Sequence, residues 1–191
     1  MMLSLARKLP IIVKYDFPLD LEAYKGIELK GKTVGIIGLG HIGKAIAERC
    51  LGLGMKVTYW SHVSRDERFE YVSLKQAFKA DVVIPTMSEN KDTKMLISRE
   101  LLQSMKLTTM FVSVVHKYYD HNLVLNMVKT GKLIGYGFES EKARDFKNYE
   151  GNIWSAPAYA WCTDTSMNNA MRLWVENMID AAKEQYPNRV N

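Results

Sequence analysis

The sequence is poor in cysteine and has no long apolar run. Its two cysteines among 191 residues cannot form a framework of disulfides, and neither has neighbours at metal-ligand spacing. Apolar runs such as 82–84 are far shorter than the ~20 residues that a membrane-spanning helix needs. The first residues also lack the apolar core and cleavage site of a secretory signal. We therefore expect a cytoplasmic protein that binds neither membrane nor metal.

The sequence also lacks any tract of clustered basic or acidic residues. Lys and Arg number 26 against 21 Asp and Glu, which gives a formal net charge of +5, but the basic residues are spread along the chain. This dispersal argues against a nucleic-acid surface. A mildly basic domain suits an anionic small ligand, and a solvated basic surface is the alternative explanation.

Short apolar runs alternate with amphipathic segments along the chain. Strands are predicted at 33–37, 56–60, 81–84, 110–114, 133–138 and 153–155, and helices at 2–9, 41–53, 73–79, from 98 onward, at 120–131 and at 166–186. We expect Pro10 to end the first helix. The alternation predicts an α/β fold in three layers, a doubly wound parallel sheet with helices on both faces.

The pattern also suggests a division of the chain. Residues 1–31 are expected to form a linking helix and a connecting segment, 32–165 the α/β domain, and 166–191 a C-terminal helix and tail. The last helix carries a stripe that includes Met167, Met171, Trp174 and Met178, which we expect to be buried in the core.

The strongest chemical signal is a glycine-rich run between the first strand of the alternation and its helix. From Gly38 to Gly43 it reads Gly-Leu-Gly-His-Ile-Gly. The first glycine permits a tight turn, the second lets the backbone approach a pyrophosphate, and the third lets helix and strand pack closely. Free N–H groups at the helix N-terminus attract phosphate. This context predicts a Rossmann dinucleotide site, with contacts from Gly38, Gly40, His41, Ile42 and Gly43.

The choice between NAD and NADP is read at the end of the second strand, roughly 20 residues further on. No acidic residue stands there. Instead Ser61, His62 and Arg65, with Arg68 nearby, could surround a 2′-phosphate. The pattern favours NADP over NAD, and the alternative is that these are solvated loop residues of a permissive site.

Several collinear stretches are similar to the D-isomer-specific 2-hydroxyacid dehydrogenases. They are 2–10, 29–40, 80–83, 92–97, 102–106 and 187–191. The resemblance implies an NAD(P)-binding domain of an oxidoreductase that acts on 2-hydroxy or 2-keto acids, and a homodimer formed through the linking helix. Glu139 takes the place of the family's Asp that meets the nicotinamide carboxamide, and the alternative is a surface carboxylate at the end of a strand. The predicted cofactor contacts therefore also include Thr86, Val115 and Glu139.

The chain departs from the family in two ways. Most of the family's substrate-binding lobe has no counterpart, so we interpret the chain as a fragment or a stand-alone cofactor domain. The family's catalytic Arg falls at Val115 or His116, its Glu at Arg144 and its His at Ala158, so none is retained. His116 is the remaining candidate for a catalytic side chain, whereas we expect His121 at the surface. The alternative to an oxidoreductase is an inactive dinucleotide-binding or dimerisation module.

Overall fold

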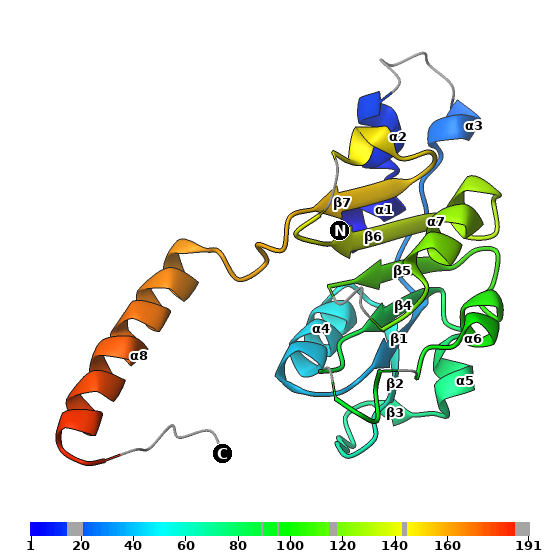
Figure 1. Cartoon of the computed structure of the whole chain (residues 1–191). Helices are drawn as coiled ribbons and strands as arrows, with labels where there is room; N and C mark the ends of the chain where they lie inside the picture. Colours follow the sequence, from blue (N-terminus) through cyan, green and yellow to red (C-terminus); the bar gives the residue numbers. More distant parts are fainter. Residues whose placement is uncertain (15–20, 89, 95, 115–117, 143–144, 186–191) are drawn as a thin grey trace. The chain divides into compact units, whose positions relative to one another are not determined.

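The structure is a computed structural model that describes residues 1–14, 21–88, 90–94, 96–114, 118–142 and 145–185 (Figure 1). Two compact units are present, Met1–Pro157 and Ala158–Asn191. The boundaries predicted at residues 31 and 165 stay predictions. No helix among the described residues is both long enough and apolar enough to cross a membrane.

The first unit is built on one parallel sheet of seven strands in the order β3-β2-β1-β4-β5-β6-β7. The strands are β1 Thr33–Ile37, β2 Lys56–Trp60, β3 Glu70–Tyr71, β4 Val82–Pro85, β5 Met110–Ser113, β6 Gly135–Glu139 and β7 Ile153–Ala156. The predicted parallel sheet and its six strands are confirmed. The sequence pattern missed β3 because two residues are too few to show a period.

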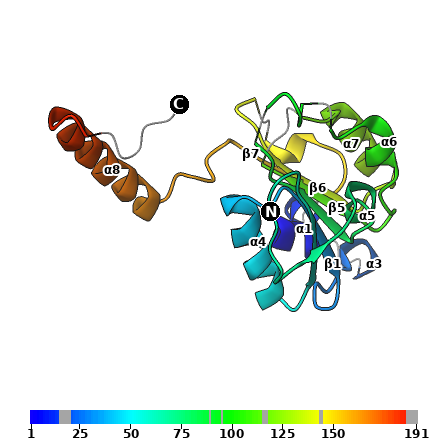
Figure 2. The ribbon, with the colours of Figure 1, turned by 90° about the horizontal axis from the view of Figure 1, so that it is seen from below.

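Helices cover both faces of this sheet. The described helices of this unit are α1 Met2–Ala6, α2 Leu9–Lys14, α3 Leu21–Tyr24, α4 His41–Gly52, α5 Leu74–Ala77, α6 Arg99–Gln103 and α7 His121–Lys129, with a short 3-10 helix at Phe146–Asn148. Figure 2 shows α1 and α4 on one face and α5, α6 and α7 on the other. Each face has its own apolar cluster, because alternate strand residues such as Ile36 and Ile37 point to opposite sides. The three-layer prediction is confirmed.

The expectation that Pro10 ends the first helix is wrong. Lys8 adopts a positive φ of 51°, which breaks the helix between α1 and α2. Pro10 then lies in the first turn of α2, where its missing N–H costs no hydrogen bond.

The second unit contains the long helix α8, Asp164–Ala182. Its N-cap is Thr163, whose hydroxyl accepts a 3.1 Å hydrogen bond from the backbone N–H of Ser166. The predicted helix is confirmed, but no described residue of α8 is buried. Trp174 and Met178 are 69% and 72% exposed. Within the second unit alone the stripe is exposed, because a single helix offers no second layer to pack against, and its expected core role stays a prediction.

Candidate functional site

The glycine-rich run lies where β1 ends, at the carboxyl edge of the sheet. β1 pairs with β2 on one side and with β4 on the other. β2 and β3 follow on one side of β1, and β4 to β7 follow on its other side. The order of the strands therefore reverses between β1 and β4. Ligands of open α/β sheets bind at such a switch point, outside the carboxyl ends of the strands.

Two glycines of this run are required by packing within the protein. Gly38 has a φ of +99°, and a Cβ there would lie 3.0 to 3.2 Å from atoms of Met87. A Cβ on Gly43 would lie 2.2 Å from the carbonyl oxygen of Gly38 and 2.9 Å from Oγ1 of Thr86. Neither position tolerates a side chain without movement of the backbone. These two glycines fix the turn and bring α4 close to β1.

Gly40 is different, because nothing in the described part of the protein requires a glycine there. It is the N-cap of α4 with an ordinary φ of −80°, and a Cβ added to it would meet no neighbouring atom within 4 Å. No described side chain caps the first turn of α4. His41 and Ile42 are exposed beside it. The open space at Gly40 and the uncapped N–H groups of a twelve-residue helix are the arrangement that a pyrophosphate needs.

Thr86 follows β4 and supports the loop from the neighbouring strand. Its hydroxyl donates a 2.6 Å hydrogen bond to the carbonyl oxygen of Gly38, and its backbone N–H donates to Ile37 at 2.8 Å. The structure thus places Thr86 beside the glycine run, and its predicted contact with the cofactor stays a prediction. Its hydroxyl proton is already used to hold the loop.

The segment after β2 carries the residues expected to choose between NAD and NADP. Ser61 is buried, and its hydroxyl accepts a hydrogen bond from the N–H of Ser64 at 3.2 Å. His62 and Arg65 are exposed. Arg65 Nη1 donates to the carbonyl oxygens of Ser61 and Ser64 at 3.0 and 2.9 Å. Ser61 therefore shapes the segment, whereas His62 and Arg65 face solvent where they could meet a ligand.

Tyr71 and Asp66, which the sequence pattern did not single out, organise this segment. The guanidinium of Arg65 lies 4.1 Å from the ring centroid of Tyr71, a cation–π contact. The carboxylate of Asp66 accepts hydrogen bonds from Nε and Nη2 of Arg68 at 2.9 and 2.7 Å and lies 3.5 Å from Nζ of Lys44. No sequence signal marks these contacts, because they depend on how the segment folds back on α4.

The ion pairs of Asp66 keep it from acting as a ribose-binding acid. The hydrogen bonds from Arg68, together with the charge of Lys44, hold the pKa of the Asp66 carboxyl well below its usual range. Both carboxylate oxygens already face donors. Nη1 of Arg68 extends the network to Glu48 at 2.9 Å. Asp66 is therefore not free to take the ribose-binding role beyond the end of β2.

Of the remaining predicted residues, the structure places Glu139 in the first unit. Glu139 is the last residue of β6 and is half-buried. Val115, His116 and Arg144 lie outside the described residues. Ala158 belongs to the second unit. The structure thus brings Glu139 to the same edge of the sheet as the glycine run.

A buried polar chain follows β5. Tyr119 hydrogen bonds to Ser113, and its hydroxyl lies 2.7 Å from that of Tyr136. Nδ1 of His121 lies 2.7 Å from the same Tyr136 oxygen. Burial raises the pKa of Tyr119 to about 12 and that of Tyr136 well above its ordinary value. His121, which we expected at the surface, is half-buried because its ring joins this chain.

The glycine run and the first turn of α4 form a cradle at the switch point between β1 and β4. This cradle and the fold together define a class, the Rossmann nucleotide-binding domains. Comparison with known proteins narrows that class. Residues 1–159 match the family model described as "D-isomer specific 2-hydroxyacid dehydrogenase, NAD binding domain". The chain belongs to this family and is its NAD(P)-binding domain.

Similar sequences include the glyoxylate reductases of Pyrococcus furiosus, 29% identical over 86% of this chain and 52% of the relative, and of Thermococcus litoralis, 30% identical over 88% and 54%. The chain thus spans about half the length of these curated relatives.

Similar solved structures include an acyclic imino acid reductase, Bsp5, in complex with NADPH and D-Arg (TM-score 0.87, 20% identity, 100% of this chain and 65% of that one). Another is a D-isomer specific 2-hydroxyacid dehydrogenase of Lactobacillus delbrueckii ssp. bulgaricus in its NAD-complexed form (TM-score 0.84, 23% identity, 100% and 66%). At these identities the likeness shows the fold.

Proposed function

We propose that this chain is the cofactor-binding half of an oxidoreductase that interconverts 2-hydroxy and 2-keto acids, and that it binds NADP in preference to NAD. The main support is the site at Gly40. There the N-terminus of α4 has no side-chain cap and faces space that no described residue fills. The names of the relatives support the reaction class, since several similar sequences are glyoxylate reductases.

The residues of the cradle fit a dinucleotide. Gly40 and the first turn of α4 would hold the pyrophosphate, and Glu139 at the end of β6 would meet the carboxamide. When bound, the nicotinamide supplies a hydride donor or acceptor. The protein's part is to orient that ring at the carboxyl edge of the sheet. The substrate would be held by the lobe that the relatives have in the other half of their length.

The preference for NADP follows from charge at the end of β2. Asp66 is paired with Lys44 and Arg68, so its carboxylate is not free to bind a ribose 2′-hydroxyl. The two cations also weaken its electrostatic repulsion of a 2′-phosphate. The exposed guanidinium of Arg65 is a suitable phosphate donor, because its fork of N–H groups matches phosphate oxygens.

A second candidate function is an inactive dinucleotide-binding module. Ala158 stands where the resemblance places the family's proton-donating His, and an alanine cannot carry a proton. Such a module would bind the dinucleotide and act through partner contact. Both candidate functions require dinucleotide binding at the cradle, so a binding assay tests both. A turnover assay distinguishes them, because only the oxidoreductase would convert a substrate.

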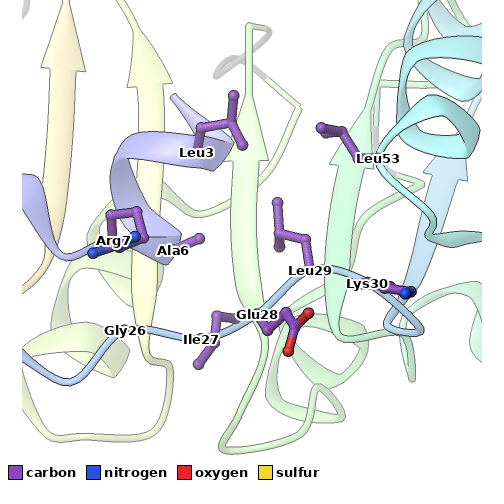
Figure 3. A pocket seen from close by; sticks show the side chains of 9 residues that line it. All are labelled: Leu3, Ala6, Arg7, Gly26, Ile27, Glu28, Leu29, Lys30 and Leu53. Carbon is purple, nitrogen blue, oxygen red and sulfur yellow. The ribbon is translucent and has the colours of Figure 1, made fainter.

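We further propose a homodimer formed through α1. Figure 3 shows the surface concerned, a cavity of about 480 Å³ between α1, the 26–30 segment and the end of α4. Leu29 points up between Leu3 and Leu53, while Arg7 and Lys30 lie at opposite ends. Leu3 is 56% exposed and Leu53 is 39% exposed. A second copy would remove this apolar area from water. The cytoplasmic location stays a prediction.

Calorimetric titration of the purified chain with NADPH and NADH tests the proposed function. We expect both to bind, NADPH more tightly by about tenfold, because one charge-assisted phosphate contact is worth that much. Exchange of Arg65 for methionine should abolish the difference while it leaves NADH affinity unchanged. Absence of binding by either nucleotide at millimolar concentration would refute the proposal.

A further inference from the structure

The segment between β2 and β3 is held to the rest of the unit at Asp66. The backbone N–H of Asp66 donates a 2.9 Å hydrogen bond to the hydroxyl of Tyr59, a residue that is 1% exposed. The side chain of Asp66 is 10% exposed and faces Lys44 on α4. Arg68 binds the same carboxylate and reaches Glu48, also on α4. One residue thus joins the segment to a core tyrosine and to the phosphate-binding helix.

Arg65 directly precedes this attachment in the chain. Its Nη1 is used by two backbone carbonyls and its plane lies over Tyr71. Within the described parts of the chain, Nε and Nη2 of Arg65 have no hydrogen-bond partner. The guanidinium is therefore held in one place with part of its donor fork unused, which lowers the entropy cost of binding an anion.

We propose that Asp66 is a positioning residue for cofactor choice, an acid that promotes binding of the NADP 2′-phosphate by holding the 61–68 segment on α4 so that Arg65 is presented to it. The inference rests on the proposed function and deepens it. It runs against simple electrostatics, because an acid near a phosphate site is expected to weaken phosphate binding. The two explanations predict opposite effects when the carboxylate is neutralised.

The test compares two charge-matched variants of the full chain, Asp66→Asn and Glu67→Gln. Glu67 is exposed in the same segment and has no partner among the residues that the structure describes. We expect Asp66→Asn to weaken NADPH binding by about tenfold and NADH binding by less than about twofold, since an ordered charge-assisted contact is lost. Glu67→Gln should leave NADPH affinity equal or slightly higher. Isothermal calorimetry gives both constants.

A ligand-free measurement reads the positioning itself. Trypsin cleaves after Arg65 and Arg68 when the segment detaches, so Asp66→Asn should be cut there faster than the wild-type protein and Glu67→Gln. A double-mutant cycle adds a second check. In an Arg65→Met background, Asp66→Asn should have no further effect on NADPH affinity, because both changes remove the same contact.

The outcomes separate this inference from the proposed function. A rise in NADPH affinity in both variants, or equal losses for NADPH and NADH in Asp66→Asn, overturns the positioning role and leaves dinucleotide binding intact. Unchanged tryptic cleavage in Asp66→Asn also overturns it. A wild-type chain that binds neither nucleotide overturns the proposed function and the role of Asp66 in cofactor choice together.

Discussion

At the scale of single residues, the glycines of one run serve two different purposes. Gly38 and Gly43 have neighbours that leave no room for a Cβ, so the protein itself needs them. Gly40 faces open space with an ordinary backbone, so no described neighbour requires a glycine there, and the proposed pyrophosphate contact would account for it. Motif matching treats the three alike, because the sequence shows residue types and not the atoms around them.

This difference predicts a contrast between Gly43→Ala and Gly40→Ala. We expect Gly43→Ala to lower the free energy of unfolding by about 1–3 kcal/mol through overpacking, and Gly40→Ala to lower it by less than about 1 kcal/mol. Both should weaken dinucleotide binding. Urea unfolding and calorimetry measure the two effects. Equal stability losses would contradict the assignment of Gly40 to ligand contact.

At the scale of elements, strands and the helices that cover them follow from local patterns. Ser73, Ser98 and Asp120 cap α5, α6 and α7, as polar residues before apolar runs indicate. Gly131 follows α7 with a φ of +72°, the left-handed conformation that glycine adopts readily. The hydrogen-bonded series from Ser113 through Tyr119 and Tyr136 to His121 could not be predicted from local patterns. It joins β5, β6 and α7, and the sequence does not show that these elements lie close together.

The buried tyrosines predict a loss of stability at alkaline pH. Burial raises the pKa of Tyr119 from 10.0 to about 12. Its folded pKa is raised, so its contribution to stability is complete below pH 10 and is lost as pH rises from 10 to 12, by at most about 3 kcal/mol. Burial also raises the pKa of Cys50 from 9.0 to about 11, so a shared decline begins near pH 9.

Tyr119→Phe should therefore be less stable at pH 7 yet lose less stability between pH 10 and 12. The exposed Tyr159 provides the control, since Tyr159→Phe should follow the wild-type profile. Chemical denaturation at each pH gives the free energies. A Tyr119→Phe profile parallel to that of the wild type would show that ionisation of this tyrosine does not limit alkaline stability.

At the scale of the whole molecule, each of the two units has a group of exposed apolar residues among its described residues. One is the cavity around Leu3 and Leu53 beside α1. The other is the stripe of α8, described within its own unit. Exposed apolar surfaces of this size are typical of sites where protein meets protein, which agrees with the proposed homodimer.

The proposed homodimer gives a test of the first surface. Leu3→Glu places a charge beside Leu53 and should convert a dimer into a monomer in size-exclusion chromatography with light scattering. Leu107→Glu is the matched control, because Leu107 is 66% exposed and follows α6, which covers the other face of the sheet. A monomeric wild-type chain, or a dimer that survives Leu3→Glu, would refute this interface.

The α/β class, the parallel sheet, the glycine-rich run and the family could all be predicted from the sequence. These depend on local periodicity and on a contiguous motif, which are properties of neighbours along the chain. The predictions for Pro10 and His121 were wrong, and the sequence pattern did not indicate the contacts of Asp66 and Tyr71. Those depend on contacts between distant segments, which the tertiary structure alone decides because burial and ion pairing arise when elements pack together.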